Sequence, residues 1–478
     1  MLIDNTTSVY MNKKYILLIS LLVPVVIFGQ NPNPNFFPVA VWLQDPSNAA
    51  AYKNAGVNMY VGLWNELDAV QLTKLTNAGM KVICEQNAFG LTKLNDTLIY
   101  GWALDDEPDN AQWNATTNQY DPCIDPSVII NQYNTVKAND SSRSVYLNLG
   151  QGVSYTDWVG RGTCTGKTEM YPDYNNGYIK GCDIASFDIY PVNNSDAKIK
   201  GNLWYVPKGI DSLMRWSSNN KPVWCWIECT KINTSSAAKP TVDNVKSEVW
   251  MALIHGVKGY GYFCHQISPF DEAALLHDAP MLAAVTAINN QVTSLATVLN
   301  SPSTFGYANV SSSNTAIPID IMTKNQGGAN YIFAVAMRSG STTATFTVNS
   351  GISVEVLGEN RTLTISGGKF TDSFSNYGVH LYKIMAPAGT QNMEAIIHNI
   401  RLYPNPFSDI LTIELNDPMP VPFDFILYDL YGKVVYEKTN IAIQKFNLRR
   451  EVLSSGMYMY LVKNKKQGIF SQGKVVVE

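Results

Sequence analysis

Residues 222–230 read Pro222-Val223-Trp224-Cys225-Trp226-Ile227-Glu228-Cys229-Thr230. This short apolar run, rich in β-branched and aromatic residues, is typical of a buried strand. A helix-like stretch at 242–255 and a second apolar run at 257–264 follow it. A strand, a helix and another strand in this order predict two parallel strands joined by a right-handed crossover.

The same unit recurs along the first 300 residues. The expected strands are 37–43, 57–64, 81–86, 100–105, 144–149, 183–190, 222–228 and 257–264. The helix-like stretches are 50–55, 67–78, 126–139, 208–217, 242–255 and 280–299. Eight such units predict an α/β fold, a (β/α)8 TIM barrel over residues 36–300. The main rival is a doubly wound open sheet, which usually has a glycine-rich phosphate turn after an early strand. The sequence lacks such a turn.

Composition narrows the class of partner. The chain has 478 residues and a net charge of −4, and 15% of its residues are charged, against about 25% in a typical soluble domain. A weakly charged chain argues against binding to nucleic acid, which needs a basic patch. Hydrophobic residues at 46% and aromatic residues at 11% argue against disorder. A polar, aromatic-rich surface suits sugars, although composition does not establish that partner.

The N-terminal segment indicates export. Lys13 and Lys14 follow Met11, an apolar run fills 15–28, and Gly29-Gln30 comes next. This arrangement predicts a secretory signal peptide over 11–30. The run is too short for a spanning helix, which needs about 20 residues. No Cys follows the run and no other segment is long enough to span, so we expect neither a lipoprotein anchor nor a stable membrane span.

The chain has seven Cys residues. Cys123, Cys164 and Cys182 lie in or beside loop-like sequence and are the better candidates for disulfides, which export permits. The other four lie in apolar strand-like runs, where a small buried hydrophobic side chain is the simpler interpretation. Without a CxxC motif or a close Cys/His cluster, we expect no zinc site. Nothing in the sequence calls for another metal or a cofactor.

Residues 303–386 have a different pattern. Short alternating stretches, separated by Gly and Ser turns, predict a small β-sandwich. The expected strands are 317–322, 331–337, 344–348, 354–356, 362–365 and 378–384. We expect this block to brace the barrel rather than to bind glycan, and we expect a linker at 386–397.

Residues 398–478 carry three diagnostic phrases: Leu402-Tyr403-Pro404-Asn405-Pro406-Phe407, then 425–434 (FILYDLYGKV), then 456–462 (GMYMYLV). They predict an all-β domain the size of seven strands. The block closely resembles the C-terminal sorting domain of the type IX secretion system of Bacteroidetes, and the phrases occur in that family's order. The resemblance implies handling by the type IX machinery, and secretion or attachment to the outer-membrane surface. An ordinary β-sandwich module is the alternative.

Carboxylates follow two of the expected barrel strands. The fourth strand leads into Asp105-Asp106-Glu107-Pro108-Asp109, and the seventh ends at Glu228. Active sites of TIM barrels lie at these carboxyl ends. Period-two alternation places Trp224, Trp226 and Glu228 on one face. Two carboxyl groups across a barrel mouth suit glycosidic-bond cleavage, with one as acid and the other, about 5–5.5 Å away, as nucleophile.

In this arrangement the barrel resembles clan-A glycoside hydrolases, retaining enzymes with catalytic Glu residues after strands four and seven. The resemblance implies that Glu107 is the acid/base and Glu228 the nucleophile. The family usually has Asn before the acid/base, and this chain has Asp106. That departure puts the usual bond to the sugar 2-hydroxyl in doubt, and leaves Asp105, Asp106 and Asp109 as rival acids.

Other polar and aromatic residues near strand ends are candidates for substrate binding. Asp188 and Tyr190 share a face after the sixth strand, where Asp188 would bind sugar hydroxyls and Tyr190 the nucleophile. Aromatic rings stack on the apolar faces of sugars. The stacking candidates are Trp42, Trp64, Trp102, Trp226 and Tyr262, for which the barrel core is an equally good place. His265, Gln266 and Asn87 are weaker pocket candidates.

The sequence therefore predicts a secreted retaining glycosidase that acts on a polysaccharide or oligosaccharide. A non-catalytic surface glycan-binding protein on a degenerate barrel is the alternative, supported by Asp106 alone. An inverting hydrolase is a third hypothesis, and a carboxyl separation above about 6.5 Å would favour it. Sugar, linkage, endo or exo action and oligomeric state are left open.

Overall fold

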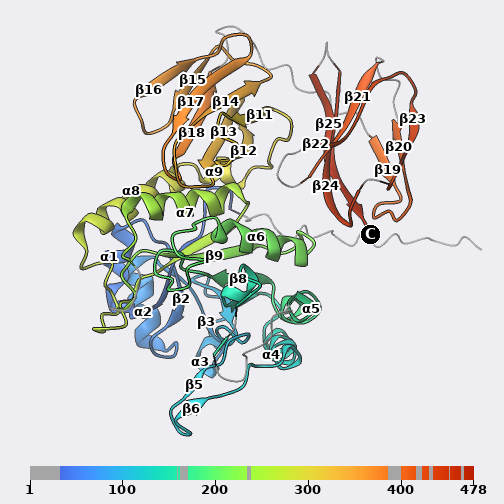
Figure 1. The fold of residues 1–478 in the computed structure, drawn as a ribbon. Coiled ribbons are helices and arrows are strands. Elements are labelled where there is room, and N and C mark those ends of the chain that lie inside the picture. The colour runs from blue at the N-terminus through green and yellow to red at the C-terminus, as the bar shows by residue number, and fades with distance from the viewer. Residues whose placement is uncertain are drawn as a thin grey trace, which may run out of the picture.

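The strands between Val39 and Phe263 form a closed barrel of eight parallel strands in the computed structural model (Figure 1). The structure describes residues 33–158, 160–161, 171–233, 238–385, 400–415, 422–429, 434–451, 453–464 and 468–478. The strands follow one another round the barrel as β1-β10-β9-β8-β7-β4-β3-β2. The predicted (β/α)8 fold is therefore confirmed. The predicted signal peptide, 11–30, and linker, 386–397, lie outside the described residues.

All eight barrel strands overlap the stretches expected from the sequence. The strands are β1 Val39–Gln44, β2 Met59–Leu63, β3 Lys81–Glu85, β4 Ile99–Ala103, β7 Ser144–Leu149, β8 Ile184–Asp188, β9 Val223–Glu228 and β10 Gly259–Phe263. The helices are α1 Ala49–Asn54, α2 Ala69–Ala78, α3 Ala88–Leu91, α4 Pro126–Asn139, α5 Tyr171–Asn176, α6 Tyr205–Trp216, α7 Val242–Ile254, α8 Ala279–Ser294 and α9 Ala296–Asn300. After β4 the chain adds a small hairpin, β5 Trp113–Asn114 and β6 Gln119–Tyr120, which projects beyond the barrel in Figure 1.

The barrel interior explains two glycines in β10. Trp224 and Trp226 of β9 point into the barrel, where they belong to a small interior cluster. A Cβ at Gly259 would lie 2.4 Å from the Trp224 ring, and one at Gly261 would lie 2.0 Å from the Trp226 ring. Both positions therefore need Gly, because only a residue without a side chain leaves room for the neighbouring indole.

Eight strands follow the barrel in two antiparallel sheets, β11-β14-β17 and β12-β13-β18-β15-β16. They are β11 Ala308–Ser312, β12 Ile319–Gln326, β13 Ala329–Ala336, β14 Thr342–Val348, β15 Ser353–Val356, β16 Arg361–Thr364, β17 Lys369–Phe374 and β18 Val379–Met385. Sequence patterning found six of these. It missed β11 and β17, whose polar residues hide the alternation of buried positions.

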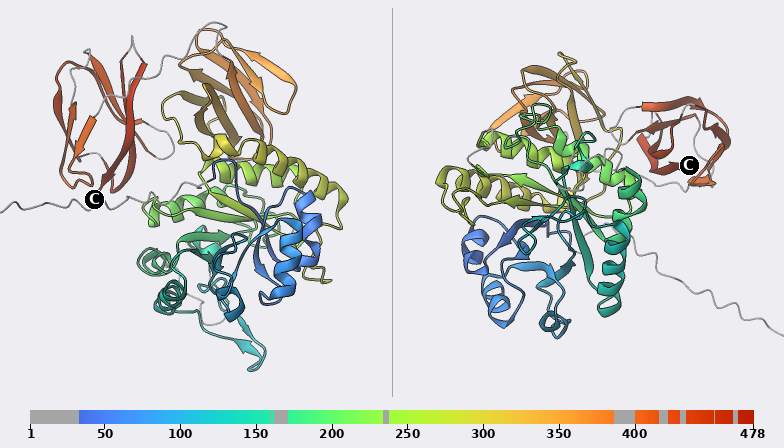
Figure 2. Two further views of the ribbon diagram at one scale, coloured as in Figure 1. Left: turned by 180° about the vertical axis from the view of Figure 1, so that it is seen from behind. Right: turned by 60° about the horizontal axis from the view of Figure 1, so that its bottom comes forward.

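The sandwich rests on the helices of the barrel, beside α7 and α8 (Figures 1 and 2). Trp250 of α7 packs on Phe333 of β13, with ring centroids 5.3 Å apart. His255, which follows α7, contacts Asp211 at 2.9 Å and Asp320 of β12 at 3.1 Å. Burial alone would lower the pKa of His255, but the two carboxylates raise it to about 10. A buried ionic contact therefore joins the sandwich to the barrel.

The described residues of the C-terminal block form seven strands in two sheets, β19-β20-β23 and β22-β21-β24-β25. They are β19 Ile400–Tyr403, β20 Ile410–Leu415, β21 Phe423–Tyr428, β22 Val434–Ile441, β23 Lys445–Arg449, β24 Gly456–Asn464 and β25 Gly468–Val477. The all-β character expected after the barrel is confirmed, while the boundary positions at 303, 386 and 398 stay predictions.

The structure also bears on the expected disulfides, membrane spans and metal sites. Cys123 is disulfide-bonded, while Cys164 lies outside the described residues. Cys182 is a free, buried thiol, so its assignment to a bridge was wrong: it packs in the hydrophobic core just before β8. In the described ranges no helix is long and apolar enough to cross a bilayer, and no group of His, Cys, Asp and Glu is arranged to hold a metal ion.

Candidate active site

A pocket of about 740 Å³ lies at the carboxyl end of the barrel. A volume of this size suits a small ligand or part of a larger one. Loops after β4, β7, β8 and β9 form most of its wall. Six residues singled out from the sequence line it: Trp42, Asp106, Glu107, Asp188, Tyr190 and Trp226.

Glu107 is held in place by backbone and side-chain contacts. Its N–H donates to Asn148 O at 3.0 Å, which extends the pairing of β4 with β7 into the loop. Asn110 Nδ2 donates to Glu107 Oε2 at 2.9 Å, and Arg161 Nη2 lies 3.4 Å from the same oxygen. With a side chain 19% exposed, Glu107 faces the pocket in one orientation.

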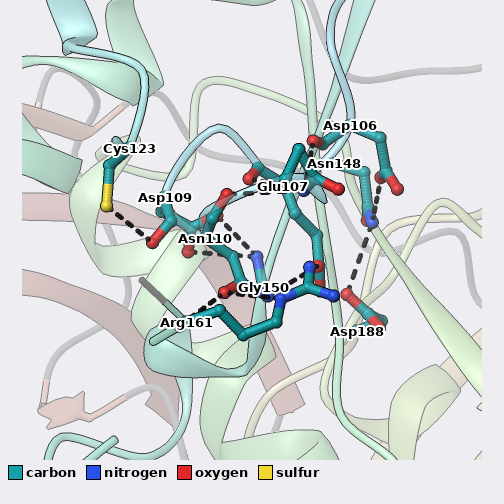
Figure 3. Close-up of polar contacts among 10 residues, drawn as sticks. Asp106, Glu107, Asp109, Asn110, Cys123, Asn148, Gly150, Arg161 and Asp188 are labelled. Carbon is teal, nitrogen blue, oxygen red and sulfur yellow. Dashed lines mark hydrogen bonds and ion pairs between the residues drawn. The ribbon is translucent and has the colours of Figure 1, made fainter. Parts of the chain in front are cut away.

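Asn148 stands between two further carboxyl groups (Figure 3). Its Nδ2 donates to Asp106 Oδ1 at 3.0 Å and reaches Asp188 Oδ1 at 3.4 Å. Asn148 Oδ1 is buried and has no hydrogen-bond partner among the described residues. The amide therefore binds two acids through its nitrogen and keeps an oxygen free for a ligand hydroxyl.

The carboxyl groups of the pocket share protons. Removal from bulk water and the charge of Glu107 raise the pKa of Asp106, although its side chain keeps solvent contact through the open pocket. The same two causes, desolvation first, raise the pKa of Asp188 well above its usual range. Desolvation raises the pKa of Tyr190 as well, so the phenol stays neutral beside Asp188. Three acids this close keep at least one proton near neutral pH.

Two rival acids lie outside the pocket. Asp105 accepts a hydrogen bond from Gln132 of α4 at 2.8 Å. Asp109 is fully buried and accepts from Gly150 N at 2.9 Å and from the Tyr174 hydroxyl at 2.7 Å. Burial, followed by the charge of Glu107, raises the pKa of Asp109 to about 7. Asp109 therefore ties the loop after β4 to the loop after β7 and supports Glu107 from behind.

Glu228 does not line the pocket. Its Oε1 accepts from Val192 N at 2.5 Å, and its Oε2 accepts from Asn193 N at 2.8 Å and Asn193 Nδ2 at 2.7 Å. The expected common face with Trp224 and Trp226 ends here, because the loop after β8 offers three donors at the last residue of the strand. The predicted nucleophile is thus a fully buried carboxylate that ties the loop after β8 to the end of β9.

Other predicted residues also lie elsewhere. Tyr262 points outward and donates to Asn289 of α8 at 2.8 Å. The buried Trp102 donates to Asp140 at 2.9 Å, and Asn87 caps α3. Trp64 and His265 are at the rim of the barrel mouth, with ring centroids 6.1 Å apart. Gln266 donates to a neighbouring carbonyl in the same rim loop.

Several lining residues escaped the sequence analysis: Asn110, Asn148, Trp158 and Arg161. Asn148 had a usable signal, since it is a polar residue near the carboxyl end of a mostly apolar strand. Arg161 had none, because it reaches Glu107 from a loop more than 50 positions away in sequence.

Comparison with protein families concerns the C-terminal block. The model of the secretion system C-terminal sorting domain matches residues 401–478. These residues are a sorting domain. The match confirms the resemblance to the type IX family, and indicates export followed by secretion or attachment to the outer-membrane surface. No curated protein matches the chain in sequence.

Solved structures resemble the chain at low identity. An α-amylase from Anoxybacillus is 9% identical, with 75% of this chain and 100% of that chain covered and a TM-score of 0.45. A bifunctional glucanase-xylanase from a metagenome library is 12% identical, covering 75% and 98%, with a TM-score of 0.46. A family 30 endoxylanase from Clostridium papyrosolvens is 11% identical, covering 75% and 98%, with a TM-score of 0.41.

Proposed function

We propose that this exported protein is a glycoside hydrolase that cleaves O-glycosidic bonds in the pocket at the barrel mouth. The observation that carries the proposal is that Glu107 and Asp188, from the loop after β4 and the end of β8, line the same pocket, where the charge of Glu107 helps to raise the pKa of Asp188. Trp42 and Trp226 lie beside them, with ring centroids 5.2 Å apart. Carboxyl groups and indole rings in one pocket suit attack at a sugar carbon.

The proposed reaction is a double displacement. The proton that Glu107 and Asp188 share passes through Glu107 to the leaving glycosidic oxygen as the bond to the anomeric carbon breaks, which leaves Asp188 ionised. A carboxylate oxygen of Asp188 attacks that carbon and forms a glycosyl-enzyme ester. Glu107, now ionised, takes a proton from water, whose oxygen displaces Asp188 and releases the sugar. This retaining course needs the two carboxyl groups about 5–5.5 Å apart, whereas inversion needs about 6.5–9.5 Å.

The resemblance to clan-A enzymes gives a different second carboxylate, Glu228. The arrangement of the side chains favours Asp188 instead, because Glu228 has three hydrogen bonds to its oxygens and no surface in the pocket. A 2-fluoro-glycoside that traps the covalent intermediate decides between them. Peptide mass mapping should find the label on Asp188, and a label on Glu228 would restore the assignment from resemblance.

Turnover provides the test of the whole proposal. Purified full-length protein is incubated with neutral and acidic polysaccharides and oligosaccharides, and the released reducing ends are sized. Glu107→Gln should lower kcat by about a thousandfold or more while thermal unfolding stays close to that of the wild type. Glycan binding with no products from any substrate would instead support the non-catalytic alternative. The sequence feature that favours this alternative is Asp106, which stands where clan-A enzymes usually have Asn.

A further inference from the structure

Exposed aromatic side chains gather at the barrel mouth. Of the five exposed large aromatic side chains in the described residues, four lie on loops after β2, β4 and β10, and the fifth is Tyr403 of the sorting domain. The four are Trp64 at 47%, Trp113 at 53%, Tyr120 at 41% and Phe270 at 57% exposed. Exposed aromatic clusters at one end of a protein mark a binding surface.

One cluster connects to the pocket through touching rings. Phe270 lies 5.6 Å from Trp64, and Trp64 lies 6.1 Å from His265, measured between ring centroids. His265 lies 5.1 Å from Phe263, and Phe263 lies 5.3 Å from Tyr190. Because Phe263 and Tyr190 line the pocket, this row of rings leads from the exposed rim to the carboxyl groups.

The second cluster lies on the other side of the mouth. Trp113 and Tyr120 face each other across the hairpin β5–β6, with centroids 5.2 Å apart. Gln112, next to Trp113, lines the pocket. The guanidinium of Arg161 lies 5.6 Å from the centre of the Tyr120 ring and also contacts Glu107, so it connects this cluster to the pocket. In the closed strand order β4 and β10 are four strands apart in either direction, so their loops face each other across the barrel.

We propose that the two aromatic clusters are the ends of an extended glycan-binding track, with the carboxyl pocket between them, and that the protein cuts within a neutral polysaccharide chain. This inference rests on the proposed hydrolase function for the cutting, but not for the binding. Sugars on both sides of the scissile bond would stack on exposed rings. The polymer is neutral because three acidic side chains and one basic side chain, Arg161, line the pocket among the described residues.

Affinity electrophoresis tests the track without turnover. The full-length Glu107→Gln protein is run in gels that contain starch, xylan, mixed-linkage β-glucan or polygalacturonate. We expect at least one neutral polymer to retard it, and polygalacturonate not to. Trp64→Ala with Phe270→Ala, and separately Trp113→Ala with Tyr120→Ala, should each weaken the affinity roughly tenfold or more. Tyr403→Ala, which removes an exposed aromatic ring outside the track, is the matched control and should change nothing.

The outcomes separate the two proposals. Retardation by no neutral polymer, or retardation that all variants retain, overturns the track. Retardation that depends on both clusters, without hydrolysis by the wild type, supports the track and contradicts the hydrolase. The protein could instead shorten the polymer only from its ends, while neither pair of substitutions changes its affinity for the polymer. That result would support the hydrolase and contradict the track. Size-exclusion chromatography covers the remaining case, since a change of oligomeric state in the cluster variants would reveal a protein interface instead.

Discussion

Glu228→Gln gives the sharpest test of what the buried carboxylate after β9 does. Glu228 accepts three hydrogen bonds, from Val192 N, Asn193 N and Asn193 Nδ2. A glutamine keeps one acceptor oxygen and turns an NH2 group toward at least one of these donors. One buried donor left without a partner costs about 1–3 kcal/mol, and the remaining bonds lose the contribution of the charge. We expect the free energy of unfolding to fall by about 2–4 kcal/mol.

A matched control comes from the neighbouring acid. Glu248 of α7 is fully buried, and burial, followed by the charge of Glu228, raises its pKa well above the usual range. Glu248 is therefore a neutral acid, and a glutamine is a neutral group of the same size. Glu248→Gln should change the free energy of unfolding by less than about 1 kcal/mol. Urea unfolding of both full-length variants, followed by tryptophan fluorescence, measures the difference.

Chemical rescue separates a loop anchor from a nucleophile. If Glu228 anchors loops, azide cannot restore turnover to Glu228→Ala, because the lost contacts lie outside the pocket. If Glu228 is the nucleophile, azide restores turnover and yields a glycosyl azide. Rescue of Glu228→Ala, together with unchanged stability of Glu228→Gln, would refute the reasoning.

Three further predictions follow from charges near the pocket and the sandwich. Asp106→Asn removes a negative charge that raises the pKa of Asp188, so the pH profile of kcat/KM should move to lower pH by about one unit; an unchanged profile would contradict a shared proton. Arg161→Ala removes the cation 3.4 Å from Glu107, and we expect kcat/KM to fall roughly tenfold, as initial rates at pH 7 would show. His255 has a pKa raised to about 10, above its unfolded value of about 6.5. Its contribution to stability is complete below about pH 6.5 and disappears as pH rises through 10, so unfolding scans should show a larger loss between pH 7 and 10 in the wild type than in His255→Gln.

Much of the fold was predictable because its signals are local. Each barrel strand is a short apolar run, and such a run needs no distant partner to be recognised. Strands β11 and β17 were missed because polar residues occupy their exposed faces and some of their half-buried positions. The sorting domain was identified because its phrases recur in a fixed order within one family.

The site was less predictable because it depends on contacts distant in sequence. Alternation along β9 placed Glu228 beside Trp226, but alternation says nothing about donors that a neighbouring loop presents at the end of a strand. Asn193 supplies two of those donors from the loop after β8. Likewise, Arg161 reaches Glu107 only because the loops after β4 and β7 meet.

The backbone at Glu107 adopts a left-handed conformation, with φ of +43°. A side chain with a Cβ pays roughly 1–2 kcal/mol for this conformation, which Gly adopts freely and Asn tolerates. Selection for thermal stability alone would therefore drive position 107 toward Gly or Asn and discard the proposed acid. A library screened for heat resistance should enrich these residues at 107, and preserving activity would require that this one position be held fixed.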